Sequence, residues 1–447
     1  MTAASPRAAA RAGLAGLLLA ALALSTLALT ATAAPSVAPA PAVSRHVLGN
    51  GMRLLVREEA SAGVVAVSLQ VSGGTRLESP DTAGITHFLH RAMLRGAGRR
   101  TGEQLAEAAE RLGGSVDASG DVDHAEVRGA ALSRHWEALL SLVADVALRP
   151  ALAPEDVERE RRLILGQIQT RLDTPFPLAL DTLLGELYGP HPYARPAAGR
   201  RESVSALGRE ALAAHHRALY RADRVVLAVS GRVERDRVRR AAERLFGDLP
   251  AGGVAPVPVP TRPETSHGRR VVARQGHQAQ VFVGFLGPAV HEADYAAVKV
   301  LAAGLGGGMA GRLFVELRER EGLAYSVGVL NPTRAGPSPI VAYMGTAPDN
   351  AERAEAGMLR ELARVRSDGL TAEELERARA YVLGGLAMDR RTNARHAWYL
   401  AFFEGLGVGW DFPERYARAV QRLTLADVGR AAERYLQSPT TVVLAPR

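Results

Sequence analysis

Residues 153–166 read APEDVERERRLILG, and residues 371–384 read TAEELERARAYVLG. The two segments align without a gap and match at Glu158/Glu376, Arg159/Arg377, Arg161/Arg379, Leu165/Leu383 and Gly166/Gly384. A second pair of segments follows in the same order. The tetrapeptide VVLA occurs at 225–228 after Tyr220 and again at 442–445 after Tyr435. Two pairs of matching segments that occur in the same order in both halves indicate a duplicated domain.

Each half combines strand and helix patterns. Residues 49–59 and 64–74 alternate apolar and polar positions and end in turn glycines, which predicts a β-hairpin. Residues 101–114 and 133–148 have helical periodicity, with Thr101 as a plausible helix start. The fold class we expect is therefore α+β, with two homologous domains, each an antiparallel-type sheet with helices packed on one face.

A composition break separates the halves. Residues 249–266, LPAGGVAPVPVPTRPETS, are rich in Pro and Gly and read as an interdomain linker. This places an N-terminal domain at 44–248 and a C-terminal domain at 267–447.

The N-terminus has the pattern of a secretory signal peptide. Arg7 and Arg11 precede an apolar run that extends to about Leu29, and ATA at 31–33 fits a cleavage site after Ala33. We predict a signal peptide at 1–33, a tether at 34–43 and a periplasmic or secreted protein. A retained anchor is the alternative. No later stretch is long and apolar enough to span a membrane once the signal is cleaved.

The amino-acid composition excludes several classes of protein. The chain has 447 residues and no cysteine, so it has no disulfide framework, thiolate metal site or cysteine nucleophile. The formal net charge is +8, but the basic residues alternate with acidic ones on the predicted helices. Such interspersed charge is typical of solvated helix faces, so we expect no nucleic-acid partner.

The segment GITHFLHRAMLRGAG (84–98) contains candidate site residues of the first half. Ile85, Phe88, Leu89, Ala92 and Met93 have the spacing of one apolar helix face. His87, His90 and Arg91 are therefore expected together on the other face.

Here the chain resembles the insulinase/pitrilysin family of zinc peptidases, whose motif is H-x-x-E-H. The resemblance covers nearly the whole mature chain, including the duplication, HPY at 191–193 and LFVELREREGLAYSV at 313–327. In that family the two histidines and a distal glutamate bind zinc, and the motif glutamate is the general base. In this chain those positions are His87, Arg91 and Gln167 for the ligands and His90 for the base.

These departures argue against a zinc site. An arginine has no acceptor lone pair, and an amide is a poorer ligand than a carboxylate. We expect no cofactor in this chain. We also expect the Arg91 cation to replace part of the metal's charge and to pair with Glu160. A rearranged site from His87, His90 and Glu160 would need new geometry.

The second half retains another family feature. Arg318 and Tyr325 in ELREREGLAY match an Arg/Tyr pair that the resemblance assigns to the substrate backbone and the developing oxyanion. Some family members pair a zinc-bearing subunit with one carrying this Arg/Tyr pair. The first hypothesis is therefore a non-catalytic, substrate-binding subunit of an exported zinc peptidase, with a zinc-bearing paralogue and a peptide as partners. The alternatives are a structural or peptide-binding pseudopeptidase, and an active peptidase with a rearranged metal site.

Overall fold

The computed structural model describes residues 42–252, 263 and 265–446. The predicted signal peptide lies outside the described residues, as do most of the predicted tether and the middle of the predicted linker. Val43, the last residue assigned to the tether, begins the first strand. Within the described ranges, no helix has the length and hydropathy needed to cross a bilayer.

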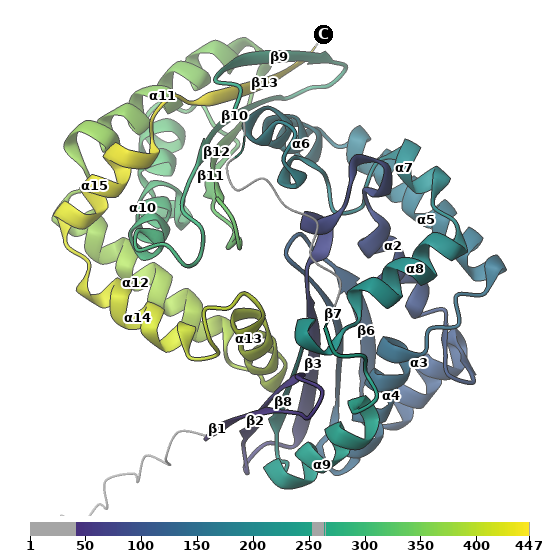
Figure 1. Cartoon of the computed structure of the whole chain (residues 1–447). Helices are drawn as coiled ribbons and strands as arrows, with labels where there is room; N and C mark the ends of the chain where they lie inside the picture. Colours follow the sequence, from purple (N-terminus) through teal and green to yellow (C-terminus); the bar gives the residue numbers. More distant parts are fainter. Residues whose placement is uncertain (1–41, 253–262, 264, 447) are drawn as a thin grey trace, which may run out of the picture. The chain divides into compact units, whose positions relative to one another are not determined.

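The first half contains a six-stranded sheet in the order β1-β2-β8-β3-β7-β6 (Figure 1). Its strands are β1 (Val43–Val47), β2 (Arg53–Glu58), β3 (Val64–Ser72), β6 (Ser115–Gly120), β7 (His124–Leu132) and β8 (Val225–Gly231). The hairpin predicted from 49–59 and 64–74 is wrong. Strand β2 pairs with β1, and β8 lies between β2 and β3, parallel to the first and antiparallel to the second.

The second half repeats this topology in the order β11-β12-β10-β13-β9. Its strands are β9 (Gly268–Arg274), β10 (Ala279–Leu286), β11 (Ser326–Leu330), β12 (Pro339–Thr346) and β13 (Thr440–Pro446). The two VVLA segments lie in β8 and β13, which occupy equivalent positions. Each pairs parallel to one neighbour and antiparallel to the other. The shared order confirms two related halves.

The helices of the first half are α2 (Ile85–Met93), α3 (Gly102–Arg111), α4 (Trp136–Leu148), α5 (Pro154–Asp173), α6 (Pro175–Tyr188), α7 (Arg201–Ala206), α8 (Arg209–Leu219) and α9 (Arg235–Phe246). Those of the second half are α10 (Tyr295–Gly306), α11 (Ala351–Asp368), α12 (Ala372–Asp389), α13 (Asn393–Gly405), α14 (Phe412–Arg422) and α15 (Leu425–Tyr435). The repeated 14-residue segments begin α5 and α12. Thr101 caps α3 together with Gln104, as the sequence predicts.

The central strands are buried on both faces, with side chains that alternate between two cores. In β8, Val225, Leu227 and Val229 face the main core of the first half, whereas Val226 and Ala228 face a smaller cluster. In β13, Val443 belongs to the main core of the second half, and Val442 and Leu444 belong to a separate cluster. Each sheet therefore needs cover on its second face.

One helix from the other half provides that cover. Helix α13 packs on β3 and β8 of the first sheet, and α6 packs on β10 and β13 of the second (Figure 1). Asn393 fixes the start of α13 by accepting from Ser230 Oγ at 2.9 Å and donating to the carbonyl of Val64 at 2.9 Å. Gly284 lets α6 approach β10, because a Cβ there would lie 2.9 Å from Leu183. The sequence pattern did not predict this exchange.

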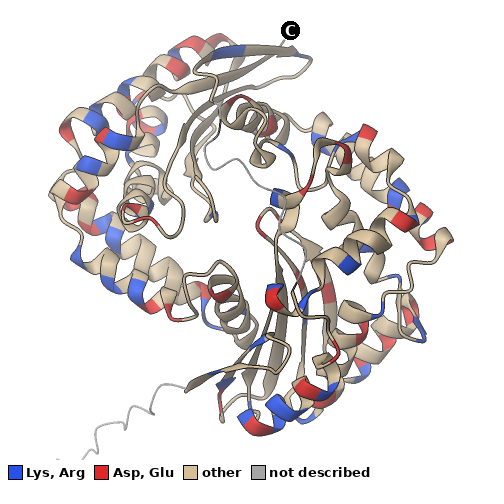
Figure 2. Cartoon of the chain, in the orientation of Figure 1, with Lys and Arg blue, Asp and Glu red and all other residues tan. Residues whose placement is uncertain are grey.

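Acidic and basic side chains alternate on the outer helices (Figure 2). Many form pairs three or four residues apart, such as Arg161 with Glu158 in α5 and Arg379 with Glu376 in α12. These two pairs occupy matching positions of the repeat. Exposed pairs of this kind contribute little to stability, so the cores hold the fold together.

Candidate functional site

Helix α2 begins where Gly84 adopts a left-handed conformation, with φ of 91°. A buried carboxylate caps this helix, because Glu78 accepts from the backbone nitrogens of Gly84 and Thr86 at 2.7 and 2.9 Å. The five apolar positions predicted for its core face are all buried. The helix is thus held in one orientation at its start and along its length.

His87 and Arg91 face the neighbouring helix α5. Arg91 Nε lies 2.7 Å from Glu160 Oε1, which confirms the predicted pair, and Arg95 Nε lies 2.7 Å from Glu160 Oε2. The Glu160 side chain is fully buried, whereas the two arginines are about one-third exposed. Both carboxylate oxygens of Glu160 are therefore occupied by cations.

Gln167 lies further along α5 and approaches His87. Burial and the nearby Arg91 cation lower the pKa of His87, while the neighbouring Gln167 side chain opposes this shift. The structure thus brings together four of the five positions singled out in the sequence: His87, Arg91, Glu160 and Gln167.

His90 is the exception, and the expectation that it shares a face with His87 and Arg91 is wrong. Its side chain is fully buried against α8 and the residue that follows it. Nδ1 donates to the carbonyl of Thr86 at 2.7 Å, so Nε2 accepts from the hydroxyl of Tyr220 at 2.8 Å. A step of three residues on a helix turns a side chain by about 300°, and here that rotation places it in the core.

These contacts do not suit a zinc ion. Catalytic zinc needs three protein ligands, yet both ring nitrogens of His90 and both oxygens of Glu160 already have partners. The residues that the structure describes include no group of three His, Asp or Glu side chains able to hold a metal. Of the three donors proposed for a rearranged site, His90 and Glu160 already have partners, which leaves only His87 with an unpaired ring nitrogen.

Arg318 and Tyr325 lie in the second half, around the π-helical segment η7 (Phe314–Arg320). The guanidinium of Arg318 is exposed and lies 4.9 Å from the Phe314 ring centroid. Tyr325 directly precedes β11 and is 59% exposed, with its backbone nitrogen donating to Gly345 at 2.8 Å. Within the described part of the chain, no hydrogen bond or ion pair occupies either polar head. Both remain available to a ligand.

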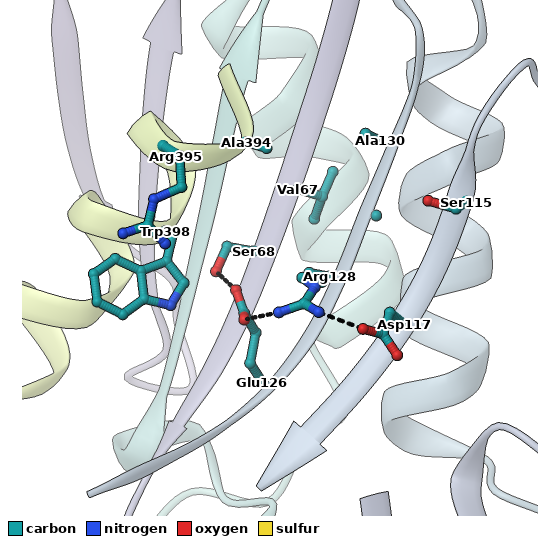
Figure 3. Close-up of a pocket in the computed structure, with 11 residues that line it drawn as sticks. Val67, Ser68, Ser115, Asp117, Glu126, Arg128, Ala130, Ala394, Arg395 and Trp398 are labelled. Atoms are coloured by element: carbon teal, nitrogen blue, oxygen red, sulfur yellow. Dashed lines mark hydrogen bonds and ion pairs between the residues drawn. The ribbon is translucent and has the colours of Figure 1, made fainter. Parts of the chain in front are cut away.

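A cavity of about 260 Å³ lies on the sheet face that α13 covers (Figure 3). Its floor is polar. The buried Glu126 accepts from Ser68 Oγ at 2.5 Å, and Arg128 bridges Glu126 and Asp117. Trp398 and Arg395 of α13 form a wall, with the guanidinium 4.4 Å from the indole centroid. Sequence analysis missed these residues. The signal was faint, namely polar positions at alternate places in an otherwise apolar β3.

Comparison with known protein families gives two matches along the chain. Residues 53–200 match the model for insulinase, peptidase family M16, and residues 206–382 match the model for the M16 inactive domain. An uncharacterized zinc protease of Mycobacterium tuberculosis (strain H37Rv) is 30% identical over 90% of this chain and 92% of its own length. The chain belongs to peptidase family M16.

Other relatives agree with this assignment. An uncharacterized zinc protease of Mycobacterium leprae is 32% identical over 77% of the M16 chain described here and 78% of its own length. A crystal structure titled peptidase M16 inactive domain, from Pseudomonas fluorescens, has a TM-score of 0.85. It covers 91% of this chain and 98% of its own, at 23% identity. That level of likeness shows the fold alone.

Proposed function

We propose that this M16 chain is a non-catalytic, substrate-binding subunit of an exported zinc peptidase. It would pair with a zinc-bearing M16 subunit that hydrolyses peptides. The chain would contribute Arg318 and Tyr325, and the partner would contribute the metal, the activated water and the general base.

The observation that carries this proposal is the ion-pair cluster that Glu160 forms with Arg91 and Arg95. Arg91 and Arg95 hold the buried Glu160 from two sides, so fixed positive charge stands where relatives with an intact motif would place a cation. Replacing a metal with an ion pair retains charge that holds the helices together. It does not supply the Lewis acid that lowers the pKa of an attacking water.

The free polar heads of Arg318 and Tyr325 support a remaining role in substrate binding. A guanidinium and a phenol are both donors to a carbonyl oxygen, and both interactions strengthen when negative charge develops there. The exposed position of each residue lets it reach a ligand outside this chain. The match of residues 206–382 to the M16 inactive domain agrees with a subunit that assists hydrolysis without performing it.

The proposal is tested by purification of the tagged chain from its native host. Mass spectrometry of the copurified proteins should identify an M16 subunit with an intact H-x-x-E-H motif, and metal analysis should place zinc in the complex. N-terminal sequencing of the mature chain should begin at Ala34. A chain that purifies without such a subunit would instead be a structural or peptide-binding pseudopeptidase.

A further inference from the structure

A second cavity, of about 440 Å³, opens beside His87 and is distinct from the one in Figure 3. Its volume falls in the range of roughly 300–1,000 Å³ that is usual for ligand pockets. Leu180 and Leu184 of α6 form an apolar wall, and Arg334 and Pro339 come from the second half. The cavity therefore combines apolar surface with several charged groups.

Two of its polar lining residues carry buried nitrogens without a hydrogen-bond partner. These atoms are His87 Nε2 and Arg195 Nε. The Arg195 guanidinium donates from another nitrogen to the backbone carbonyl of Glu78, so its position is fixed while Nε stays unused. Buried polar groups are nearly always paired, so unpaired ones beside a cavity indicate a ligand that supplies acceptors.

Two of the three arginines that line the cavity, Arg195 and Arg334, are only loosely compensated. Arg334 lies 4.0 Å from a single Asp121 oxygen and 5.9 Å from the Tyr193 ring centroid. The carboxylate of Glu78, near Arg195, is already held by two backbone nitrogens. By contrast, Asp181 has both oxygens on Arg171, at 2.6 and 2.7 Å. Asp181, the less exposed of the two acids that line the cavity, is thus neutralised, whereas the unused donors belong to Arg195, Arg334 and His87.

We propose that this cavity binds a carboxylate of a peptide, with His87, Arg195 and Arg334 as its donors. A carboxylate offers two oxygens with about four acceptor positions, which suits the three donors that line this cavity. Charge-assisted hydrogen bonds to it are stronger than those to a neutral carbonyl. The apolar wall from α6 accommodates the rest of the residue. The ligand class rests on the proposed function only in taking the carboxylate to belong to a peptide.

The test is isothermal titration of the full chain with two matched peptide pairs. One pair is acetyl-AAEAA-amide and acetyl-AAQAA-amide, and the other is acetyl-AAAAA as free acid and as amide. In at least one pair, the acidic member should bind about tenfold tighter than the neutral one. The first pair reports a side-chain carboxylate and the second a C-terminal one. Equal affinities within both pairs, or no binding by any peptide, would overturn the proposal.

Substitutions of the lining residues test whether the preference for acidic peptides arises in this cavity. His87→Leu and Arg334→Gln should each reduce the acidic preference to about threefold or less, with unchanged circular dichroism. Arg195→Lys keeps the charge but removes the Nε donor, and it should also weaken the preference. The matched control is Arg128→Gln, an arginine with an aspartate partner in the other cavity, which should leave the preference intact. A preference that survives all three cavity variants would contradict the assignment. Because no partner subunit is present, the result is independent of the pairing experiment.

Discussion

Arg91 Nε lies 2.7 Å from Glu160 Oε1, across the contact between α2 and α5. By the resemblance to the H-x-x-E-H motif, this arginine falls at the position of a zinc-binding histidine. Glu160 is completely buried, and a second arginine, Arg95, satisfies its other oxygen. A buried carboxylate with two cations is stable only as a set. Glu160, Arg91 and Arg95 thus form an ion-pair cluster that links the two helices.

The first prediction concerns the loss of stability when this ion-pair cluster is broken. Glu160→Gln should lower the free energy of unfolding by about 2–3 kcal/mol, because two guanidiniums lose their charged acceptor. This value is below that for a fully buried pair, since Arg91 and Arg95 are 34% and 32% exposed. Urea denaturation would measure the change. The control is Glu158→Gln on the same helix. Its side chain is 55% exposed, and Arg161 keeps its hydrogen bonds to the carbonyls of Val204 and Ser205, so the unfolding midpoint should stay nearly unchanged.

The second prediction concerns metal. The wild-type chain should retain no zinc after dialysis. Restoring the full motif, including His90→Glu, would place a carboxylate in the core beside Tyr220 and should destabilise the fold. The double variant Arg91→His with Gln167→Glu leaves His90 in place and completes a ligand set with His87. We expect it to bind about one zinc per chain, measured by atomic emission after dialysis.

Adding His87→Ala to the double variant should abolish the binding, which separates a true site from adventitious zinc. No peptide cleavage is expected, because the base position still holds a histidine that is hydrogen-bonded within the core. A folded double variant without zinc would show that α2 and α5 no longer have the spacing of a metal site.

The third prediction concerns acid stability. Burial lowers the pKa of His90 to about 3 and that of His215 to about 4, and it also lowers the pKa of His216. A histidine with a depressed folded pKa stabilises the fold fully above its unfolded pKa of about 6.5. This contribution is lost as the pH falls towards the folded value.

At pH 5, protonation of the unfolded chain should cost about 2 kcal/mol for each of His90 and His215. Urea titrations between pH 7.5 and 5 would measure this loss. His90→Gln should flatten the pH dependence, whereas His277→Gln, at an exposed position, should not. Parallel curves for wild type and His90→Gln would show that His90 does not carry the effect.

The sequence predicted what depends on local pattern. The repeated segments become equivalent helices, and Thr101 caps α3. The pairing of Arg91 with Glu160 was predicted from the family resemblance, since the two residues are 69 positions apart. The pairing of strands that are far apart in the chain could not be predicted from the sequence. Residues 49–59 and 64–74 have hairpin spacing, but β8 comes from about 160 residues later and inserts between them. The apolar pattern of one strand does not show which other strand will pair with it, because a distant strand can offer the same apolar surface as a neighbouring one.

The missed orientation of His90 has a similar cause. Helical spacing gives its angle but not the neighbour on that side. A polar partner in the core, the Tyr220 hydroxyl, makes it favourable to bury a neutral imidazole. The packing of α6 and α13 on the sheets of the opposite halves also follows from tertiary contacts, because an apolar helix face does not by itself specify which sheet it covers.

The last prediction concerns Arg318 and Tyr325. Both side chains are exposed, so Arg318→Ala and Tyr325→Phe should leave the free energy of unfolding within about 0.5 kcal/mol of wild type. In a complex reconstituted with the copurified zinc-bearing subunit, each should lower peptide turnover by about a hundred- to a thousand-fold, the usual cost of losing one oxyanion donor. Tyr325→Phe keeps the ring and removes only the hydroxyl, so it separates hydrogen bonding from packing. Gel filtration would verify assembly, and Arg320→Ala, an exposed neighbour on η7 paired with Glu316, is the matched control. Wild-type turnover in both assembled variants would make the pair structural and the chain a scaffold.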